Sequence, residues 1–565
     1  MTEIFLKLRN NIVLESDLQL AEREIQSLFA QCRPINNDTI NRIKFIPKRF
    51  IISHSKKDGV IGYIVSGCKV KFEKIIKLLS FVQEVWSSTE LCDSDVCYSV
   101  HNCGAYCYIP TMTMSEILFY TKNPSVETAE KVVKTLALVE DGNKEVDTAI
   151  NRVKTSAPHI HSFHTYKAKF FPRFVRSLIV SNIDNERDEI KICDPFVGSG
   201  TTLIESALMG YKSIGIDIDA LSCFISQVKS SAIDLVQCKC ANIDDALLST
   251  KGTNHYTFPE EIVKKFQRWD KLEEMYDYQN QISSILNYID SIPSPQKELL
   301  KIALSDALTR KFNIRMMGTG SGRFALEIGK TSLVSIIKSD IANEIKAIRV
   351  ICTLRDIYNL VMPSPVVING DATKRPIESN SVDLIITSPP YIPASSGRED
   401  YLVGKLISLK AMGLYNDNDV DYCKKNSVGS MNIGSDELGD MPQDVVRLYK
   451  WLINDELRCI KARPIIAYYK SIISSLKEDV RTLKNGGRII YIIGKETIFY
   501  NSATKEILYN VECDKIFSEI ARMVGLSIVE IINIELDKKD KIARPRGSDK
   551  YYECAIVMEK PNSKS

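Results

Sequence analysis

The stretch Asp194-Pro195-Phe196-Val197-Gly198-Ser199-Gly200-Thr201-Thr202 decides the fold of this chain. The apolar run 190–193 precedes it, and the segment 203–209, which has the pattern of a helix, follows it. A strand that ends here must turn tightly and enter a helix whose first amides face a ligand. Gly198 and Gly200 lack a β carbon, so the backbone can adopt unusual dihedral angles and a ligand can approach it closely.

A second strand, 212–216, ends in the acidic sequence Gly215-Ile216-Asp217-Ile218-Asp219. Strand, glycine turn, helix and second strand form one βαβ unit, which favours a parallel doubly wound sheet. Asp217 is placed to accept hydrogen bonds from the hydroxyl groups of a ribose. The pattern therefore predicts a nucleoside-containing cofactor, and the lack of a G-x-G-x-x-G turn argues against a dinucleotide. We expect Thr201 or Thr202 to cap the helix.

The next informative stretch is Thr387-Ser388-Pro389-Pro390-Tyr391, which follows an apolar strand at 383–386. Two consecutive prolines fix φ twice and remove two donors, so the loop is rigid and presents carbonyl oxygens. An exocyclic amine needs such acceptors, because its lone pair is delocalised into the ring. Hydrogen bonds from the N–H groups of the amine to the Ser388 hydroxyl and to the Pro389 carbonyl would draw the nitrogen toward sp³ geometry and free its lone pair. Tyr391 is expected to stack on a base that has left the helix.

One more acid follows a strand of this region. Asp371 comes after the apolar run 366–369 and is a candidate acceptor for an adenine amino group. A turn-forming aspartate is the alternative at this position. A stiff surface turn is likewise the alternative at 388–391, but the presence of the glycine turn 194–202 in the same chain argues against it.

These residues together resemble the amino-methyltransferases of DNA, which act on cytosine N4 or adenine N6. The stretch 194–202 resembles the cofactor motif of that family, 215–219 its ribose-binding acid and 388–391 its catalytic motif. The resemblance implies S-adenosylmethionine as the cofactor, and Ser388, Pro389, Pro390 and Tyr391 as catalytic residues. The serine version of the motif is associated chiefly with cytosine N4.

A third match lies upstream, where His164-Thr165-Tyr166-Lys167-Ala168-Lys169-Phe170-Phe171-Pro172 resembles the family segment H-x-Y-x-A-K-F-x-P. In the family, this segment flanks the methionine end of the cofactor. The resemblance covers about half of the chain. With the acids described above, it implies a cofactor site made of His164, Lys169, Asp194, Pro195, Phe196, Gly198, Gly200, Thr201, Asp217 and Asp371.

The fold class expected is α/β: a Rossmann-like class I methyltransferase sheet with a helical insertion and an N-terminal α+β domain. We expect four parts, which are an N-terminal domain of unknown role at 1–150, the cofactor half at 151–235, a mostly helical insertion at 236–362 with a possible role in target recognition, and the catalytic half at 363–565. The patterns also predict helices over 71–85 and 260–276, a polar linker at 141–158 and a basic loop at 311–323.

Double-stranded DNA is the expected partner, with a cognate restriction endonuclease as a further one. The implied reaction is cytosine-N4 methylation, with adenine-N6 methylation second. RNA stays an alternative, because guanine-N2 methyltransferases of tRNA resemble this motif order and often carry an N-terminal RNA-binding domain. A catalytically silent subunit is the third alternative. Two basic clusters could contact phosphates, and their candidate residues are Arg315, Arg323, Lys541, Arg544 and Arg546.

Composition limits the alternatives only weakly. A net charge of +3 over 565 residues does not by itself indicate a nucleic-acid-binding protein. No apolar run is long enough to cross a bilayer and no export signal begins the chain, so we expect no membrane partner and a cytoplasmic location. The spacing of Cys92, Cys97, Cys103 and Cys107 differs from the paired knuckles of structural zinc sites, so we expect no metal.

Overall fold

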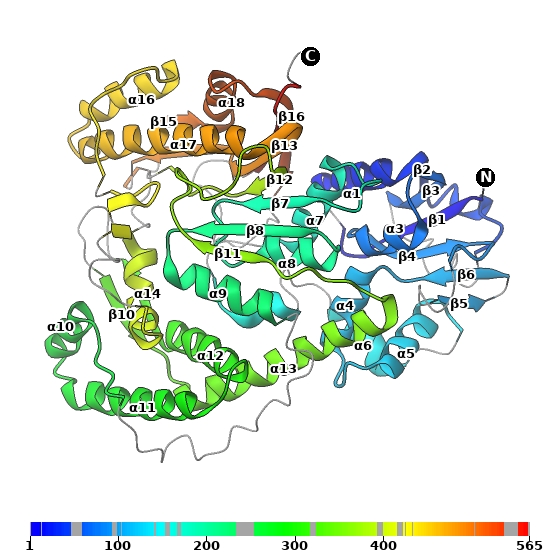
Figure 1. Cartoon of the computed structure of the whole chain (residues 1–565), viewed down its shortest axis with the longest axis horizontal. Coiled ribbons are helices and arrows are strands. Elements are labelled where there is room, and N and C mark those ends of the chain that lie inside the picture. The colour runs from blue at the N-terminus through cyan, green and yellow to red at the C-terminus, as the bar shows by residue number, and fades with distance from the viewer. Residues whose placement is uncertain are drawn as a thin grey trace.

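The computed structural model describes residues 2–12, 14–46, 59–92, 99–102, 104–139, 143–152, 159–166, 171–232, 254–316, 324–392, 399–414, 422–423, 425–431, 433–501, 503–504, 506–535 and 552–562. Every helix within these residues is too short or too polar to span a membrane. Figure 1 shows the whole chain, with the N-terminal unit to the right of the central sheet.

The central sheet has seven strands in the order β11-β8-β7-β12-β13-β17-β16. The first five of these are mutually parallel, and β17 runs antiparallel to both of its neighbours. This is the Rossmann-like class I methyltransferase sheet that the resemblance implies, and its parallel part is what the glycine turn predicts. The strands are β7 (Lys191–Asp194), β8 (Lys212–Asp217), β11 (Val366–Asn369), β12 (Val382–Thr387), β13 (Leu483–Gly494), β16 (Ser527–Glu535) and β17 (Tyr552–Glu559).

Helices cover both faces of this sheet. Side chains alternate along β12 from Leu384, so that Leu384 and Ile386 join one hydrophobic core while Ile385 joins the other. Val382 lies before a register shift in this strand and also joins the second core. The first core includes α7 (Pro172–Asn182), α8 (Thr201–Leu208) and α9 (Ala220–Ser231). The second includes α16 (Gln443–Ile453), α17 (Ala462–Thr482) and α18 (Cys513–Met523). Between these helices lie η5 (Cys459–Lys461) and the hairpin β14 (Glu496–Tyr500) and β15 (Ile507–Glu512).

The N-terminal unit is a six-stranded sheet with the order β2-β3-β1-β4-β6-β5. It shares the first hydrophobic core with the cofactor half, and the Ser177 hydroxyl of α7 donates to the Leu20 carbonyl at 3.1 Å. The elements are β1 (Ile4–Leu8), α1 (Glu15–Leu28), β2 (Phe29–Asn36), η1 (Ile40–Arg42), β3 (Val60–Cys68), α3 (Phe72–Leu78), β4 (Val82–Ser87), β5 (Ser99–Asn102), β6 (Ala105–Tyr108), α4 (Thr111–Tyr120), α5 (Val126–Leu136) and α6 (Lys144–Arg152), and η2 (His159–Phe163) follows.

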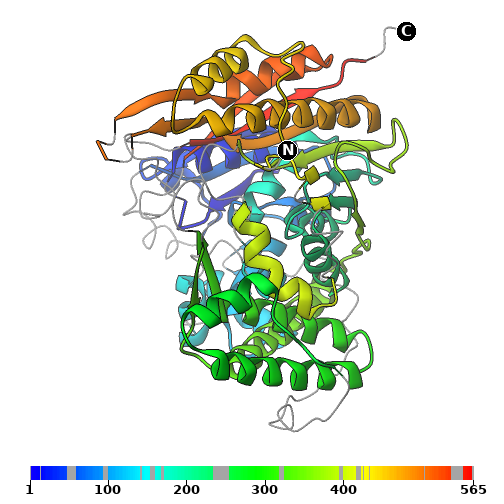
Figure 2. The same ribbon diagram turned by 90° about the vertical axis from the view of Figure 1, so that its left-hand side faces the viewer.

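The block between the two halves of the central sheet is mostly helical. In Figure 2, helix α14 (Glu399–Ala411) lies between the catalytic half above and this block below. The elements of the block are α10 (Glu260–Arg268), α11 (Leu272–Ser291), α12 (Gln296–Lys311), β9 (Phe312–Met316), β10 (Phe324–Ile328) and α13 (Leu333–Tyr358).

Four local predictions were wrong. The helix expected over 71–85 ends at Leu78, because 82–87 pairs as the central strand β4. The segment 260–276 is broken where Asp270 takes a φ of 55°, outside the helical region. The expected linker contains helix α6, whose Val146 and Ala149 are buried. The expected loop at 311–323 begins with a strand, since β9 pairs with β10.

Candidate active site

The loops that follow the parallel strands meet at one edge of the central sheet, as the carboxyl ends of parallel strands do. β7 ends at Asp194 and runs into the glycine turn, where Gly198 has a φ of 51° and Gly200 a φ of 81°. These left-handed values are costly for residues with a β carbon, which explains both glycines. A β carbon on Gly200 would also lie 3.2 Å from Ser226.

The predicted threonine cap of the following helix is wrong. The N-cap residue of α8 is Gly200, and no side chain caps the helix. Thr201 instead lies in the first turn, where its buried hydroxyl has no hydrogen-bond partner in the described part of the chain. An orphaned hydroxyl at a helix N-terminus beside a glycine turn fits a polar ligand such as the cofactor implied by the sequence.

Two carboxylates flank this turn. Asp194 Oδ1 accepts hydrogen bonds from the Phe196 amide at 3.1 Å and from the Thr387 hydroxyl at 2.6 Å. Asp217 accepts from the Gly198 amide at 3.0 Å through Oδ2 and from the Asp219 amide at 3.0 Å through Oδ1. Burial raises the pKa of Asp194 to about 6, and burial together with the charge of Asp219 raises the pKa of Asp217 to about 6. The buried Pro195 completes the turn.

Asp371 forms the turn that follows β11. Its Oδ1 accepts from both the amide and the hydroxyl of Thr373, each at 2.8 Å. The turn-forming role that the sequence left open is therefore present, and a contact with adenine stays a prediction. The neighbouring Asn369 side chain donates to the carbonyls of Asp217 and Ile218 at 3.0 and 3.2 Å, so the ends of β11 and β8 are tied together.

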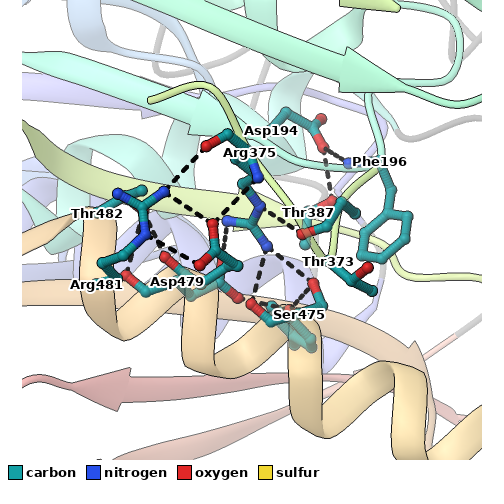
Figure 3. A network of polar contacts seen from close by, with 12 residues as sticks. Asp194, Phe196, Thr373, Arg375, Thr387, Ser475, Asp479, Arg481 and Thr482 are labelled. Atoms are coloured by element: carbon teal, nitrogen blue, oxygen red, sulfur yellow. Dashed lines mark hydrogen bonds and ion pairs between the residues drawn. The ribbon is translucent and has the colours of Figure 1, made fainter. Parts of the chain in front are cut away.

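A buried network fixes this turn from below (Figure 3). The guanidinium of Arg375 donates to the Ala372 carbonyl at 2.8 Å and forms an ion pair with Asp479 of α17. Arg375 also donates to the Ser475 hydroxyl at 2.8 Å, and Tyr491 of β13 donates to Asp479 at 2.6 Å. Sequence reasoning missed Arg375 and Asp479, because their partners lie about a hundred positions away.

The predicted catalytic turn follows β12, the strand next to β7 in the sheet. Ser388 is half-buried and Pro389 is buried. The Pro390 carbonyl accepts a hydrogen bond from the Tyr468 hydroxyl at 3.0 Å. Tyr391 is half-buried, and its hydroxyl donates to Glu553 Oε1 of β17 at 2.8 Å. Two elements of the catalytic half thus anchor the turn on both sides.

The upstream segment reaches the glycine turn through a residue that was not predicted. The Tyr166 hydroxyl is hydrogen-bonded to the Ser222 hydroxyl at 3.0 Å, and it lies 3.3 Å from where a β carbon of Gly198 would be. His164 instead packs against the insertion, since its Nε2 lies 3.0 Å from the Ser305 hydroxyl of α12. Burial lowers the pKa of His164 to about 4, so the ring is neutral at pH 7. Lys169 lies outside the described residues.

A second set of buried charges supports the glycine turn from the N-terminal side. Lys229 of α9 is fully buried and donates to the Ser199 carbonyl at 3.4 Å. Glu205 of α8 is bonded at 2.7 Å by Nε of Arg176 and by Nε2 of His161. Charged residues within otherwise apolar helices were the only sequence signal for this set.

The five side chains predicted to contact nucleic acid lie outside the described part of the structure. Arg323, Lys541, Arg544 and Arg546 lie outside the described residues, and Arg315 lies in β9 with its side chain outside the description. Their role stays a prediction.

Two family models match the chain. The model described as DNA methylase matches residues 100–227, which include the upstream segment and the glycine turn. The model described as RMKL-like, methyltransferase domain, matches residues 177–356.

Three related proteins are Type II methyltransferases. M.MjaII of Methanocaldococcus jannaschii is 39% identical over 124 residues, which cover 22% of this chain and 22% of that protein. M.MvaI of Kocuria varians is 23% identical over 62% of this chain and 79% of its own length. M.BsoBI of Geobacillus stearothermophilus is 25% identical over 52% of this chain and 60% of its own length. The match to the first of these relatives thus spans about a fifth of its length.

The family models cover the cofactor half of the candidate site and end before the predicted catalytic turn 387–391. The first family model covers Asp194, Gly198 and Asp217, which the structure joins through the glycine turn. The strand order adds an independent argument for a class I methyltransferase sheet. In the matched residues, the chain is therefore similar to DNA methylases and to Type II methyltransferases.

Proposed function

We propose that this protein transfers a methyl group from S-adenosylmethionine to an exocyclic amino group of a base in double-stranded DNA, with cytosine N4 as the first candidate and adenine N6 as the second. One observation carries the proposal. The hydrogen bond from Thr387 to Asp194 joins the start of the catalytic turn to the start of the glycine turn. Residues suited to bind a nucleoside cofactor and residues suited to hold an amine therefore meet at the same edge of the sheet.

The main requirement of the reaction is that the protein positions the base amine against the methyl group. S-adenosylmethionine would supply a methyl group that its sulfonium already activates, so that the N–C bond forms as the S–C bond breaks, the neutral thioether leaves and the amine gives up one proton to solvent. The Ser388 hydroxyl and the Pro389 carbonyl accept the N–H groups of the base, which localises the lone pair on the nitrogen and orients it. Tyr391 stacks on the base after it has left the duplex. Tyr468 and Glu553 support this turn through the Pro390 carbonyl and the Tyr391 hydroxyl.

Ser388 supports cytosine N4 over adenine N6, because a serine at this motif position is associated chiefly with cytosine N4 in the family that the sequence resembles. The names of the three relatives support a role beside a restriction endonuclease, since all are Type II methyltransferases. Site-specific methylation within a restriction-modification system is therefore part of the proposal.

The experiment measures methyl transfer from labelled S-adenosylmethionine to unmethylated duplex DNA and, in parallel, to unmodified tRNA. Products are digested to nucleosides and identified by mass spectrometry. The Ser388→Ala variant, which loses the hydroxyl acceptor and keeps the fold, is the control for catalysis. We expect N4-methylcytosine in DNA, and a loss of label with Ser388→Ala.

Each outcome decides between the candidates. N6-methyladenine in DNA would keep the DNA target and overturn the cytosine assignment. Methylguanine found in tRNA alone would overturn the DNA proposal in favour of the RNA alternative. Full activity of Ser388→Ala would overturn the role given to the catalytic turn.

A further inference from the structure

A lysine from the helix after the catalytic turn reaches the acidic turn of the cofactor site. Lys405 of α14 forms an ion pair with Asp219, and its ammonium donates to the Ser222 hydroxyl at 3.1 Å. The same ammonium lies 5.0 Å from the centre of the Tyr166 ring, within the range of a cation–π contact. Lys405 therefore contacts three residues that surround the glycine turn, although neither motif includes it.

The position of Lys405 is fixed by its helix. Leu406 and Ile407 are buried, the Ser408 hydroxyl donates to the Ser305 carbonyl at 3.2 Å, and the Tyr256 hydroxyl donates to the Ile407 carbonyl at 3.3 Å. The side chains of Lys405 and Asp219 are only 19% and 15% exposed. This ion pair is thus unlike an exposed one, whose partners are solvated and mobile.

The ion pair changes the charge balance of the acidic turn. Asp217 and Asp219 lie two positions apart at the end of β8, and each disfavours the charge of the other. Among the described residues, the titratable side chains that face this acidic turn are those of Lys405, Tyr166 and Cys223, and Lys405 is the cation of these three. The charge of Lys405 lowers the pKa of both carboxyls, and it holds that of Asp219 below its ordinary value despite burial.

Asp219 also has a structural role, since its Oδ1 accepts a hydrogen bond from the Leu221 amide at 3.0 Å and caps α9. Asp217 is the carboxylate that the sequence assigns to the ribose. We propose that Lys405 is a positioning residue of the cofactor site, whose ammonium neutralises Asp219 so that Asp217 remains an acceptor for the ribose hydroxyls. This inference rests on the proposed function, because it takes S-adenosylmethionine as the ligand.

Calorimetric titration of the full chain with S-adenosylmethionine between pH 6 and 8.5 tests the role of Lys405. We expect Lys405→Met to weaken affinity about twofold at pH 7 and about fivefold at pH 6, since a rise of one unit in the pKa of an acceptor that titrates near 6 lowers its ionised fraction by those factors. The pH at which affinity falls to half should also move upward. Lys405→Arg keeps the charge and should restore both values. The matched control is Lys264→Met, which removes a lysine whose ion pair with Glu260 is exposed.

A double variant provides a second test of the inference if Lys405→Met alone is poorly folded. Asp219→Asn retains a capping side chain but removes the charge that Lys405 neutralises. In the Asp219→Asn background, Lys405→Met should therefore have little further effect on affinity. Thermal unfolding without cofactor identifies which variants are folded.

The outcomes separate this inference from the proposed function. A wild-type protein that binds no S-adenosylmethionine at any pH would overturn the proposed function and, with it, the role of Lys405. Binding by the wild type with unchanged affinity and pH profile in Lys405→Met would overturn the inference alone. An equal loss at every pH, not rescued by arginine, would also overturn it, because it would indicate a packing role.

Discussion

The hydroxyl of Thr387 donates a 2.6 Å hydrogen bond to Asp194 Oδ1, and the two residues are the last of β12 and β7. They lie 193 positions apart in the sequence and on neighbouring strands of the sheet. Asp194 opens the glycine turn and Thr387 opens the catalytic turn. This bond therefore sets the position of one turn relative to the other.

Thr387→Val should lower turnover about tenfold or more, since a hydrogen bond to a charged group contributes about 1.5–3 kcal/mol. Valine has the shape of threonine but leaves the Asp194 carboxylate without this donor. Initial rates with DNA measure the effect, and Thr387→Ser, which keeps the hydroxyl, should be close to wild type. Equal rates for valine and serine variants would show that the bond is not needed.

Cofactor affinity should fall as the pH drops through about 6, where Asp217 becomes protonated and stops accepting hydrogen bonds from a ribose. At pH 5 the affinity should be about tenfold weaker than at pH 7, following the ionised fraction. Asp217→Asn cannot titrate, so its weaker affinity should vary less with pH. Calorimetric titrations of both proteins between pH 5 and 8 make the comparison, and parallel profiles would exclude Asp217 as the titrating group.

The stability of the cofactor-free protein should respond to Asp217 in the opposite direction. The pKa of this carboxyl is higher in the folded protein than its ordinary value of 3.8, so the folded state binds the proton more tightly. The free energy of unfolding of the wild type, relative to Asp217→Asn, should therefore rise as the pH falls from about 6 to about 4. Denaturant titrations at several pH values measure this difference, and a falling difference would contradict the raised pKa.

Tyr391→Ala should reduce turnover more than Tyr391→Phe. Phenylalanine loses the hydrogen bond to Glu553 and keeps a ring that can stack, whereas alanine loses the stacking surface, which contributes about 1–3 kcal/mol per base. Both variants should bind S-adenosylmethionine like the wild type in calorimetric titrations. If the phenylalanine variant is as slow as the alanine variant, the bond to Glu553 rather than stacking explains the role of Tyr391.

Arg375→Met should lower the free energy of unfolding by about 3–5 kcal/mol, because it leaves the buried Asp479 carboxylate without its ion-pair partner. Chemical denaturation measures the loss. The control is Arg447→Met, which removes an exposed ion pair with Asp444 and should cost less than about 1 kcal/mol. A similar small loss for both variants would mean that Arg375 does not anchor the Asp371 turn.

The elements predicted most accurately are those with a local cause. The strands at 191–194 and 212–217 and the helix between them follow from apolar runs and from two glycines that take left-handed dihedral angles. The errors have a tertiary cause. Residues 82–87 form a strand because β1 and β6 pair with them on both sides, and no pattern within the segment records those partners.

The sequence by itself determined the two turns, their order along the chain and the polar groups that Asp217 and Ser388 offer there, because turn geometry and side-chain type depend on a few adjacent residues. Only the tertiary structure decided which distant residues complete the site. His164 lies against the insertion, whereas Tyr166 and Lys405 lie beside the glycine turn. Contacts of this kind depend on how helices pack over the sheet, which no local pattern encodes.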